Sequence, residues 1–140
     1  MLRFKQLLEW LKYFDRDEDL NSWFKDQPLP PVLFSTIQTV GKPPRIEEVK
    51  ERALYFVSVQ DKPKWVLFQC PCGCHDVITL SLQKTHRPHW SLSKSEQNRA
   101  ILYPSVWRDT GCLSHFWIHD GRVYWCHDTG ISPFKRSFSV

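Results

Sequence analysis

The chain of 140 residues lacks the features that mark several common protein classes. It has no apolar run near the roughly 18 residues that a membrane-spanning helix needs. It also has no cluster of Lys and Arg residues, because its formal net charge of +4 is spread along the chain. Nucleic-acid-binding domains usually carry a basic stripe or patch. We therefore expect neither a membrane span nor a nucleic-acid partner.

Glycine is scarce as well, with five residues, whereas proline is frequent, with ten. No internal repeat or low-complexity segment is visible. The chain has 41% apolar residues and 14% aromatic residues, which is enough to bury the core of one domain. The low glycine and high proline content is typical of short strands joined by rigid loops.

A secretory signal is not expected either. The apolar residues of segment 1–14 are interrupted by Lys5, Glu9 and Lys12, so they form no continuous apolar stretch. We expect a cytoplasmic protein, in which thiols stay reduced. An odd count of five cysteines also fits a metal site better than a set of disulfides.

The sequence divides into three segments that differ in predicted secondary structure. Residues 1–27 are predicted to be helical, because apolar residues recur at helical spacing over residues 2–14 and an acidic stretch precedes a second short helix. Residues 28–52 are predicted to be a proline-containing linker, with residues 32–37 as a candidate edge strand. Residues 53–140 alternate like strands and are predicted to form a zinc-stabilised β domain. The expected class is α+β, with a small, mainly antiparallel β domain.

The dipeptide Asp120-Gly121 is the strongest local signal, because Asp-Gly between two strands is typical of a two-residue hairpin loop. This register pairs His119 with Arg122 and places His115 opposite Cys126. One face of the hairpin is expected to enter the core and carries Phe116, Ile118, Val123 and Trp125. The other face carries His115, Trp117, Tyr124 and Cys126.

The cysteines indicate a zinc site. Cys70, Cys72 and Cys74 fall within five residues, and Cys112 and Cys126 follow in a second strand-like region. Three ligand sets are open: the first three cysteines with Cys112, two of them with Cys112 and Cys126, or a site that uses His115 with Cys126. Because cysteine alone can fill all four positions, we predict a structural Zn²⁺ rather than a catalytic one.

The succession CPCGC (70–74), LYPSVW (102–107) and GCLSHFWIHDGRVYWC (111–126) resembles a bacterial and phage family of zinc-binding domains of unknown function. The resemblance covers roughly residues 53–126. Some members of that family lie beside genes for bacterial ubiquitin-like modifiers and their E1- and E2-like enzymes. The resemblance implies zinc binding and a role in processing or removing a ubiquitin-like protein.

Such chemistry needs a nucleophile and a base. Since the cysteines are assigned to metal, serine is the more plausible nucleophile. Ser105 follows a proline at a turn and could approach His115, whereas Ser114 would point to the opposite side of the strand from its neighbour. Asp109 or Asp120 could orient the imidazole.

We therefore predict a serine-type protease or isopeptidase, resembling a deubiquitinase, with Ser105 and His115 as the catalytic pair. The predicted partners are a ubiquitin-like protein and its E1- or E2-like enzymes. The alternative is a zinc module without catalytic activity that binds the modifier or those conjugating enzymes.

Overall fold

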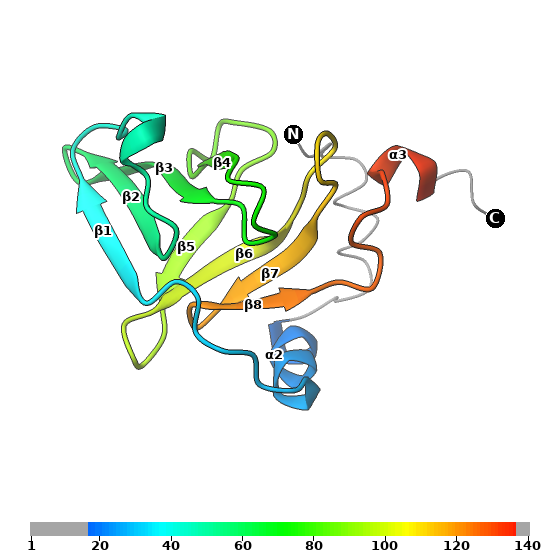
Figure 1. Cartoon of the computed structure of the whole chain (residues 1–140). Coiled ribbons are helices and arrows are strands. Elements are labelled where there is room, and N and C mark those ends of the chain that lie inside the picture. Colours follow the sequence, from blue (N-terminus) through cyan, green and yellow to red (C-terminus); the bar gives the residue numbers. More distant parts are fainter. Residues whose placement is uncertain (1–16, 137–140) are drawn as a thin grey trace.

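The computed structural model describes residues 17–136, in which eight strands form two four-stranded sheets (Figure 1). The predicted helix over residues 2–14 lies outside the described residues. The first sheet has the order β1-β2-β3-β4, with β1 Thr36–Val40, β2 Ala53–Val59, β3 Lys62–Gln69 and β4 Val77–Ser81. The second has the order β5-β6-β7-β8, with β5 Ser91–Lys94, β6 Ala100–Trp107, β7 His115–His119 and β8 Arg122–Trp125.

The described part is mostly β and mainly antiparallel, as predicted. Only the pairing of β1 with β2 is parallel among the strand pairs of residues 17–136. Helical structure there consists of α2 Asp17–Asp26, the 3-10 helix η1 Ile46–Glu48 and the short α3 Pro133–Arg136. None of these helices has the length and apolar character needed to cross a membrane.

The segment 28–52 differs from the expected linker, because it belongs to the folded body. It supplies the edge strand β1, which begins at Thr36, four residues later than the candidate strand 32–37. It also supplies Phe34, which is fully buried, and Val49, which packs against β2 and β3. Prolines 28, 30 and 31 end helical structure but do not separate two units.

The main core lies between the two sheets and takes side chains from both. Its fully buried members include Phe34, Leu54, Val66, Phe68, Ala100 and Phe116. The Phe34 and Phe68 rings meet edge to face at 5.4 Å, and Phe68 in turn contacts Phe116 at 6.3 Å. Burying each large apolar side chain contributes about 1.5–3 kcal/mol, so this layer is the principal stabilising element.

The hairpin at Asp120-Gly121 has the predicted register: His119 pairs with Arg122 and Phe116 with Trp125. Both loop residues have positive φ, 53° at Asp120 and 67° at Gly121, as a two-residue hairpin of this type requires. Gly121 has a second reason to lack a side chain. A Cβ there would lie 2.4 Å from the Phe34 carbonyl oxygen, where the segment before β1 crosses the hairpin.

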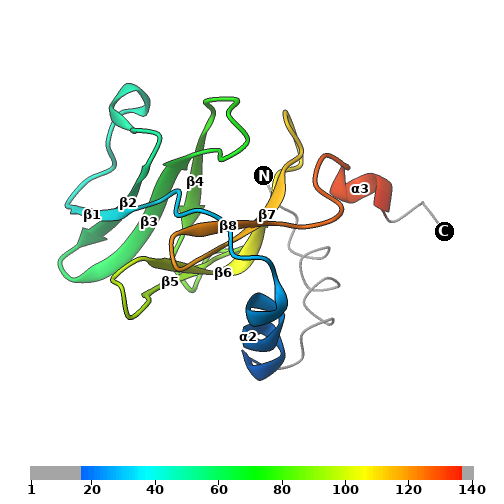
Figure 2. The same ribbon diagram turned by 60° about the horizontal axis from the view of Figure 1, so that its bottom comes forward.

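Helix α2 covers the outer face of the second sheet, on the side away from the first sheet (Figures 1 and 2). Leu20 and Phe24, one helical turn apart, are both buried, and Trp23 is half-buried. The Phe24 ring meets Trp117 at 5.6 Å and Tyr124 at 5.0 Å. Both faces of the β7–β8 hairpin are therefore covered.

Helix α2 thus covers the face of the hairpin that the sequence did not assign to the core. The face that carries His115, Trp117, Tyr124 and Cys126 is buried along its length. Trp125, which we assigned to the core face, is 44% exposed although its ring contacts Phe116. Strand alternation indicates which residues share a face, but not which elements later cover it.

Candidate active site and cysteine cluster

A bulge in β6 positions Ser105. Leu102 pairs with Ile118 and Val106 with Phe116, so the three residues 103–105 of β6 lie opposite the single residue Trp117 of β7. Bulges of this kind bend a strand and redirect a side chain. Ser105 is fully buried here, and its carbonyl oxygen accepts a hydrogen bond from Trp90 Nε1 at 3.2 Å.

The structure brings Ser105 and His115 into direct contact. Ser105 Oγ lies 3.1 Å from His115 Nε2, and His115 Nδ1 lies 2.6 Å from Asp128 Oδ1. With its proton on Nδ1, the ring donates to Asp128, and Nε2 accepts from the Ser105 hydroxyl. The exposed fractions are 0% for Ser105, 0% for His115 and 4% for Asp128. Nucleophile, base and orienting carboxylate therefore have the connectivity of a Ser-His-Asp triad.

Two features fix the imidazole. The Trp107 ring stacks on it at 4.2 Å with an interplanar angle of 1°. The turn after β8 then wraps around the strand: the Cys126 N–H donates to the His115 carbonyl at 2.9 Å, and the His115 N–H donates to Thr129 Oγ1 at 3.0 Å. Asp128 lies in the middle of this turn, which explains how a residue outside any strand reaches Nδ1.

The orienting carboxylate corrects the sequence-based choice of Asp109 or Asp120, because the Nδ1 hydrogen bond goes to Asp128. Asp120 instead pairs with Arg99, whose Nη2 lies 2.8 Å from its Oδ2. Burial alone would raise the pKa of Asp120, but hydrogen bonds from Arg99 and Ser95 outweigh burial and lower it. A signal for Asp128 did exist, because it follows Cys126 by two residues and the hairpin register places Cys126 opposite His115.

Ser114, the second candidate nucleophile, faces the cysteines. Its hydroxyl donates to Cys112 Sγ at 3.1 Å. The alternation of side chains along a strand therefore separates Ser114 from the adjacent His115 side chain, as expected.

Cys70, Cys72, Cys74 and Cys112 form a compact cluster with their sulfur atoms all within 4.8 Å of one another. Cys70 follows β3 directly, and the turn that carries Cys72 and Cys74 contains Gly73 at a φ of 92°. Cys112 comes from the loop between β6 and β7, in the other sheet. Four thiols at this spacing match the donor set of a structural zinc site.

The charge around the cluster fits such a site. Arg108 Nη1 lies 3.3 Å from Cys112 Sγ and 3.1 Å from Asp76 Oδ2. Burial raises the pKa of Cys70. At Cys112, burial acts in the same direction, but hydrogen bonds, foremost from Ser114, outweigh it and lower the pKa to about 6. A guanidinium beside the sulfurs would offset the negative charge of thiolate ligands.

Cys126 lies apart from this cluster. Its sulfur belongs to a second group with His115 and Asp128, whose donor atoms are also within 4.8 Å of one another. Of the three ligand sets left open by the sequence, the structure gathers the first completely, with Cys70, Cys72, Cys74 and Cys112. It also brings together the His115 and Cys126 pair of the third set, whereas the second set, which joins Cys126 to the cluster, is not formed.

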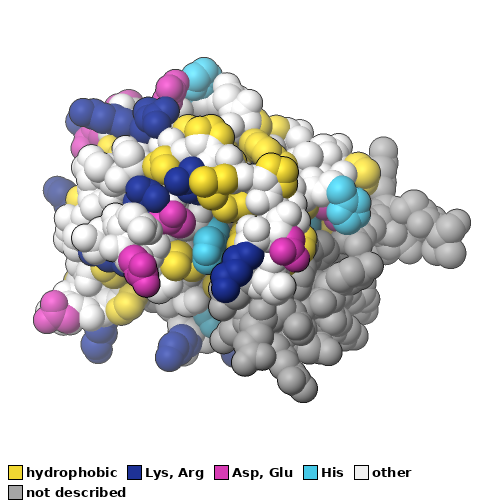
Figure 3. Space-filling view, turned by 90° about the horizontal axis from the view of Figure 1, so that it is seen from below, with side chains coloured by type: hydrophobic (Ala, Val, Ile, Leu, Met, Phe, Trp, Pro, Cys, Tyr) yellow, Lys and Arg dark blue, Asp and Glu magenta, His cyan; other side chains and the backbone are white. Residues whose placement is uncertain are grey.

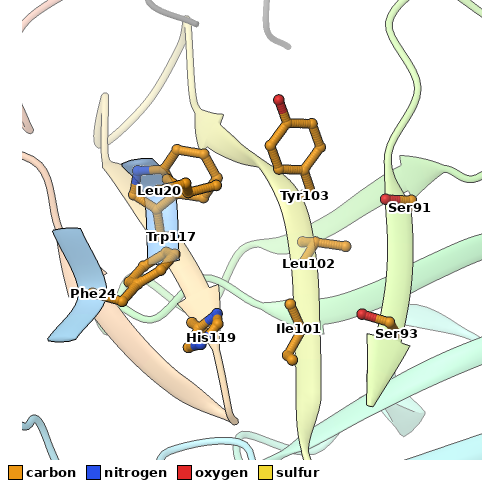
Figure 4. A pocket seen from close by; sticks show the side chains of 9 residues that line it. All are labelled: Leu20, Phe24, Ser91, Ser93, Ile101, Leu102, Tyr103, Trp117 and His119. Carbon is orange, nitrogen blue, oxygen red and sulfur yellow. The ribbon is translucent and has the colours of Figure 1, made fainter. Parts of the chain in front are cut away.

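A hollow of about 420 Å³ lies on the outer face of the second sheet, beside the triad strands (Figure 4). Its floor is β6, one wall is formed by α2 and β7, and Ser91 and Ser93 of β5 form the other wall. Trp117 and Tyr103 line it, each two residues from a triad member on the same strand. On the face seen in Figure 3, acidic and basic side chains are interspersed with apolar ones.

A family model described as "Bacterial ubiquitination-like system serine protease (BubE)" matches residues 40–126, more than half of the 140-residue chain. The chain belongs to the BubE family. This result agrees with the resemblance to a family associated with ubiquitin-like conjugation, and it places the chain among the serine proteases of that kind of system. No curated protein and no solved structure matches the chain. The BubE match ends two residues before Asp128.

Proposed function

We propose that this BubE-family chain hydrolyses the peptide or isopeptide bond at the C-terminus of a ubiquitin-like modifier through Ser105, His115 and Asp128. The observation that supports this most is the pair of hydrogen bonds from Ser105 Oγ to His115 Nε2 and from His115 Nδ1 to Asp128. The family description supplies the reaction class and the biological system.

In the proposed reaction, Ser105 Oγ attacks the scissile carbonyl while His115 Nε2 takes the hydroxyl proton. Asp128 holds the ring in the tautomer with a proton on Nδ1 and stabilises the imidazolium. His115 then gives its proton to the leaving amine, which departs and leaves an ester on Ser105. Water, deprotonated by the same nitrogen, hydrolyses the ester and restores the hydroxyl.

The four-thiol cluster is proposed to hold one Zn²⁺ through Cys70, Cys72, Cys74 and Cys112. With four protein ligands, the ion has no open position for water or substrate, so it acts as a cross-link. That cross-link joins the end of β3 to the loop that leads into β7. Because Cys112 precedes His115 by only three residues, the cluster also fixes the start of the strand that carries the base.

The hollow on the second sheet is proposed to receive the tail of the modifier. Tyr103 and Trp117 would contact apolar side chains, and the β5 edge would offer main-chain hydrogen bonds to an extended peptide. Since Ser105 is fully buried, the tail can reach it only when the site opens. The free protein is proposed to sample this opening transiently, and binding energy from the remote part of the modifier would favour it further.

The test uses the modifier fused at its C-terminus to a reporter protein, together with a modifier joined to a lysine side chain. Ser105→Ala should retain fold and binding but lose several orders of magnitude in cleavage rate, as other hydrolases do when the nucleophile is removed. Ser114→Ala is the matched control and should cleave at close to the parent rate. Cleavage of only one of the two substrates would distinguish processing of the precursor from removal of the modifier.

Full activity in Ser105→Ala would contradict the assignment. If the parent protein binds the modifier but cleaves neither substrate, the chain would instead be a zinc module without catalytic activity that binds the modifier or its conjugating enzymes.

A further inference from the structure

The second group of potential metal ligands shares two of its three residues, His115 and Asp128, with the triad. His115, Cys126 and Asp128 offer one nitrogen, one sulfur and one oxygen, and these atoms lie within 4.8 Å of one another. All three residues are buried, with exposed fractions of 0%, 5% and 4%. Imidazole, thiolate and carboxylate are the three side-chain ligand types that zinc accepts. A plain Ser-His-Asp triad has no need of the sulfur.

The hairpin register produces this juxtaposition. The Cys126 N–H donates to the His115 carbonyl at 2.9 Å, which holds the two residues side by side at the end of β8. The turn then brings Asp128 back to the imidazole. The residues that alternate with Cys126 and Asp128, namely Trp125, His127 and Thr129, are exposed, so the group lies one residue layer below the surface.

We propose that His115, Cys126 and Asp128 form a second metal site, separate from the four-thiol cluster, at which zinc reversibly switches the protease off. The binding part of this inference stands on the donor geometry, and the regulatory part rests on the proposed function. Three protein ligands leave the fourth position to water, so this site binds zinc more weakly than four thiolates do. It therefore responds to changes in available zinc while the cluster stays occupied.

Coordination disables the base through the imidazole tautomer. Zinc on Nδ1 replaces the hydrogen bond to Asp128, whose 2.6 Å length must widen to about 3.3 Å to fit two tetrahedral bonds. The single proton of the neutral ring then resides on Nε2, which donates to Ser105 Oγ and cannot accept its proton. Cys126 binds as thiolate and releases its own proton to solvent. The ring proton is conserved and one proton leaves the protein.

The test starts from full-length protein with its four-thiol cluster loaded with zinc. A fluorophosphonate probe measures the reactivity of Ser105 without any assumption about the natural substrate. Added Zn²⁺ should suppress labelling, and a chelator too weak to strip the cluster should restore it. Added Co²⁺ should produce the near-ultraviolet thiolate-to-cobalt absorption of a second site.

Cys126→Ala is the deciding variant, since the proposed reaction does not use the sulfur. It should label like the parent without added metal. Loss of an outer-shell partner alone typically costs about 10–100-fold in metal affinity, so loss of this direct ligand should raise the inhibitory Zn²⁺ concentration by at least that factor. Cys126→Val fills more of the space left by the sulfur and should give the same result as Cys126→Ala. It therefore controls for a packing defect in the alanine variant.

Equal inhibition of the parent and Cys126→Ala would overturn the proposal, because the metal would then act elsewhere. So would a parent protein whose labelling is unaffected by saturating Zn²⁺. If Ser105 does not label at all, the proposed protease function fails, but the cobalt absorption still decides the site. Its presence in the parent and absence in Cys126→Ala would support the metal site alone.

Discussion

The cysteine cluster and the triad both border the loop between β6 and β7, yet they differ in exposure and in origin. Cys72 and Cys74 are exposed, whereas Ser105 and His115 are fully buried. Three of the four thiols come from one short turn, whereas the triad takes one residue each from β6, β7 and the turn after β8. A site that only holds the fold together can remain at the surface. A buried catalytic site of the kind proposed here excludes bulk water and needs a way to open to its substrate.

The two regions are also connected, because the loop between β6 and β7 belongs to both. Arg108 contacts Cys112 Sγ, and its N–H donates to the Ser114 carbonyl at 2.9 Å. Ser114 in turn donates to Cys112 and directly precedes His115. The comparison therefore predicts an asymmetry: damage to the cluster should abolish both fold and activity, whereas damage to the triad should abolish activity alone.

The largest expected effect is on the cluster side. Removal of zinc by a strong chelator, or Cys112→Ser, should unfold most of the protein. Domains of this size are stable by only about 5–15 kcal/mol, and a structural zinc contributes about 10 kcal/mol or more in small zinc domains. Thermal denaturation with parallel elemental analysis measures this effect. Cys126→Ala is the control and should keep one tightly bound zinc per chain. If the chelated protein unfolds at the same temperature as the parent protein, the predicted dependence of the fold on the cluster is wrong.

On the triad side, Asp128→Asn should lower kcat by about 10⁴-fold, the loss known for the same change in other triad enzymes, because the imidazole loses its orienting acceptor. Its zinc content and melting temperature should stay close to those of the parent. Asp120→Asn provides the matched control. It breaks the pair with Arg99 and should cost about 1–2 kcal/mol of stability, with kcat unchanged. The reverse pattern would restore Asp120 as the orienting residue.

The smallest expected effect concerns His119, which packs against helix α2 on the outer face of the second sheet. His119 stacks on Phe24 of α2 at 4.1 Å, and burial lowers its pKa. Below about pH 6.5, His119 is therefore protonated more readily in the unfolded chain than in the folded chain. The free energy of unfolding then falls as the pH falls. His119→Gln should reduce the loss of stability between pH 7 and 5.5, measured by denaturant unfolding. The exposed His75 is the control, and equal effects of the two substitutions would rule out this role for His119.

Local sequence signals predicted much of the fold. Residues from 53 onward do form strands, and Asp120-Gly121 indicated the register that places His115 beside Cys126. The parallel pairing of β1 and the burial of Phe34 were missed, because they depend on contacts distant in sequence. Proline-rich composition favours a loop but does not indicate what the loop packs against.

The candidate site, too, was predicted only in part. The pairing of Ser105 with His115 was predicted from chemistry, since a serine nucleophile needs a neighbouring base. The predicted turn at Ser105 was wrong, because Ser105 lies buried within strand β6. Asp128 was missed because turn residues follow no periodic pattern. The available signal was its closeness in sequence to Cys126, which the register places opposite His115. The bulge at residues 103–105 was missed too. Regular alternation along β6 does not predict it, yet the bulge decides where the Ser105 side chain points.

The central claim is that Ser105, activated by His115 and Asp128, is the reactive nucleophile. The most direct measurement is to map the covalent adduct of a fluorophosphonate by peptide mass spectrometry, in the parent protein and in Asp128→Asn. We expect a single adduct on the peptide that contains Ser105, formed at a rate that falls sharply in the variant while the protein stays folded. An adduct on Ser114 or on a cysteine, or equal labelling in Asp128→Asn, would contradict the claim.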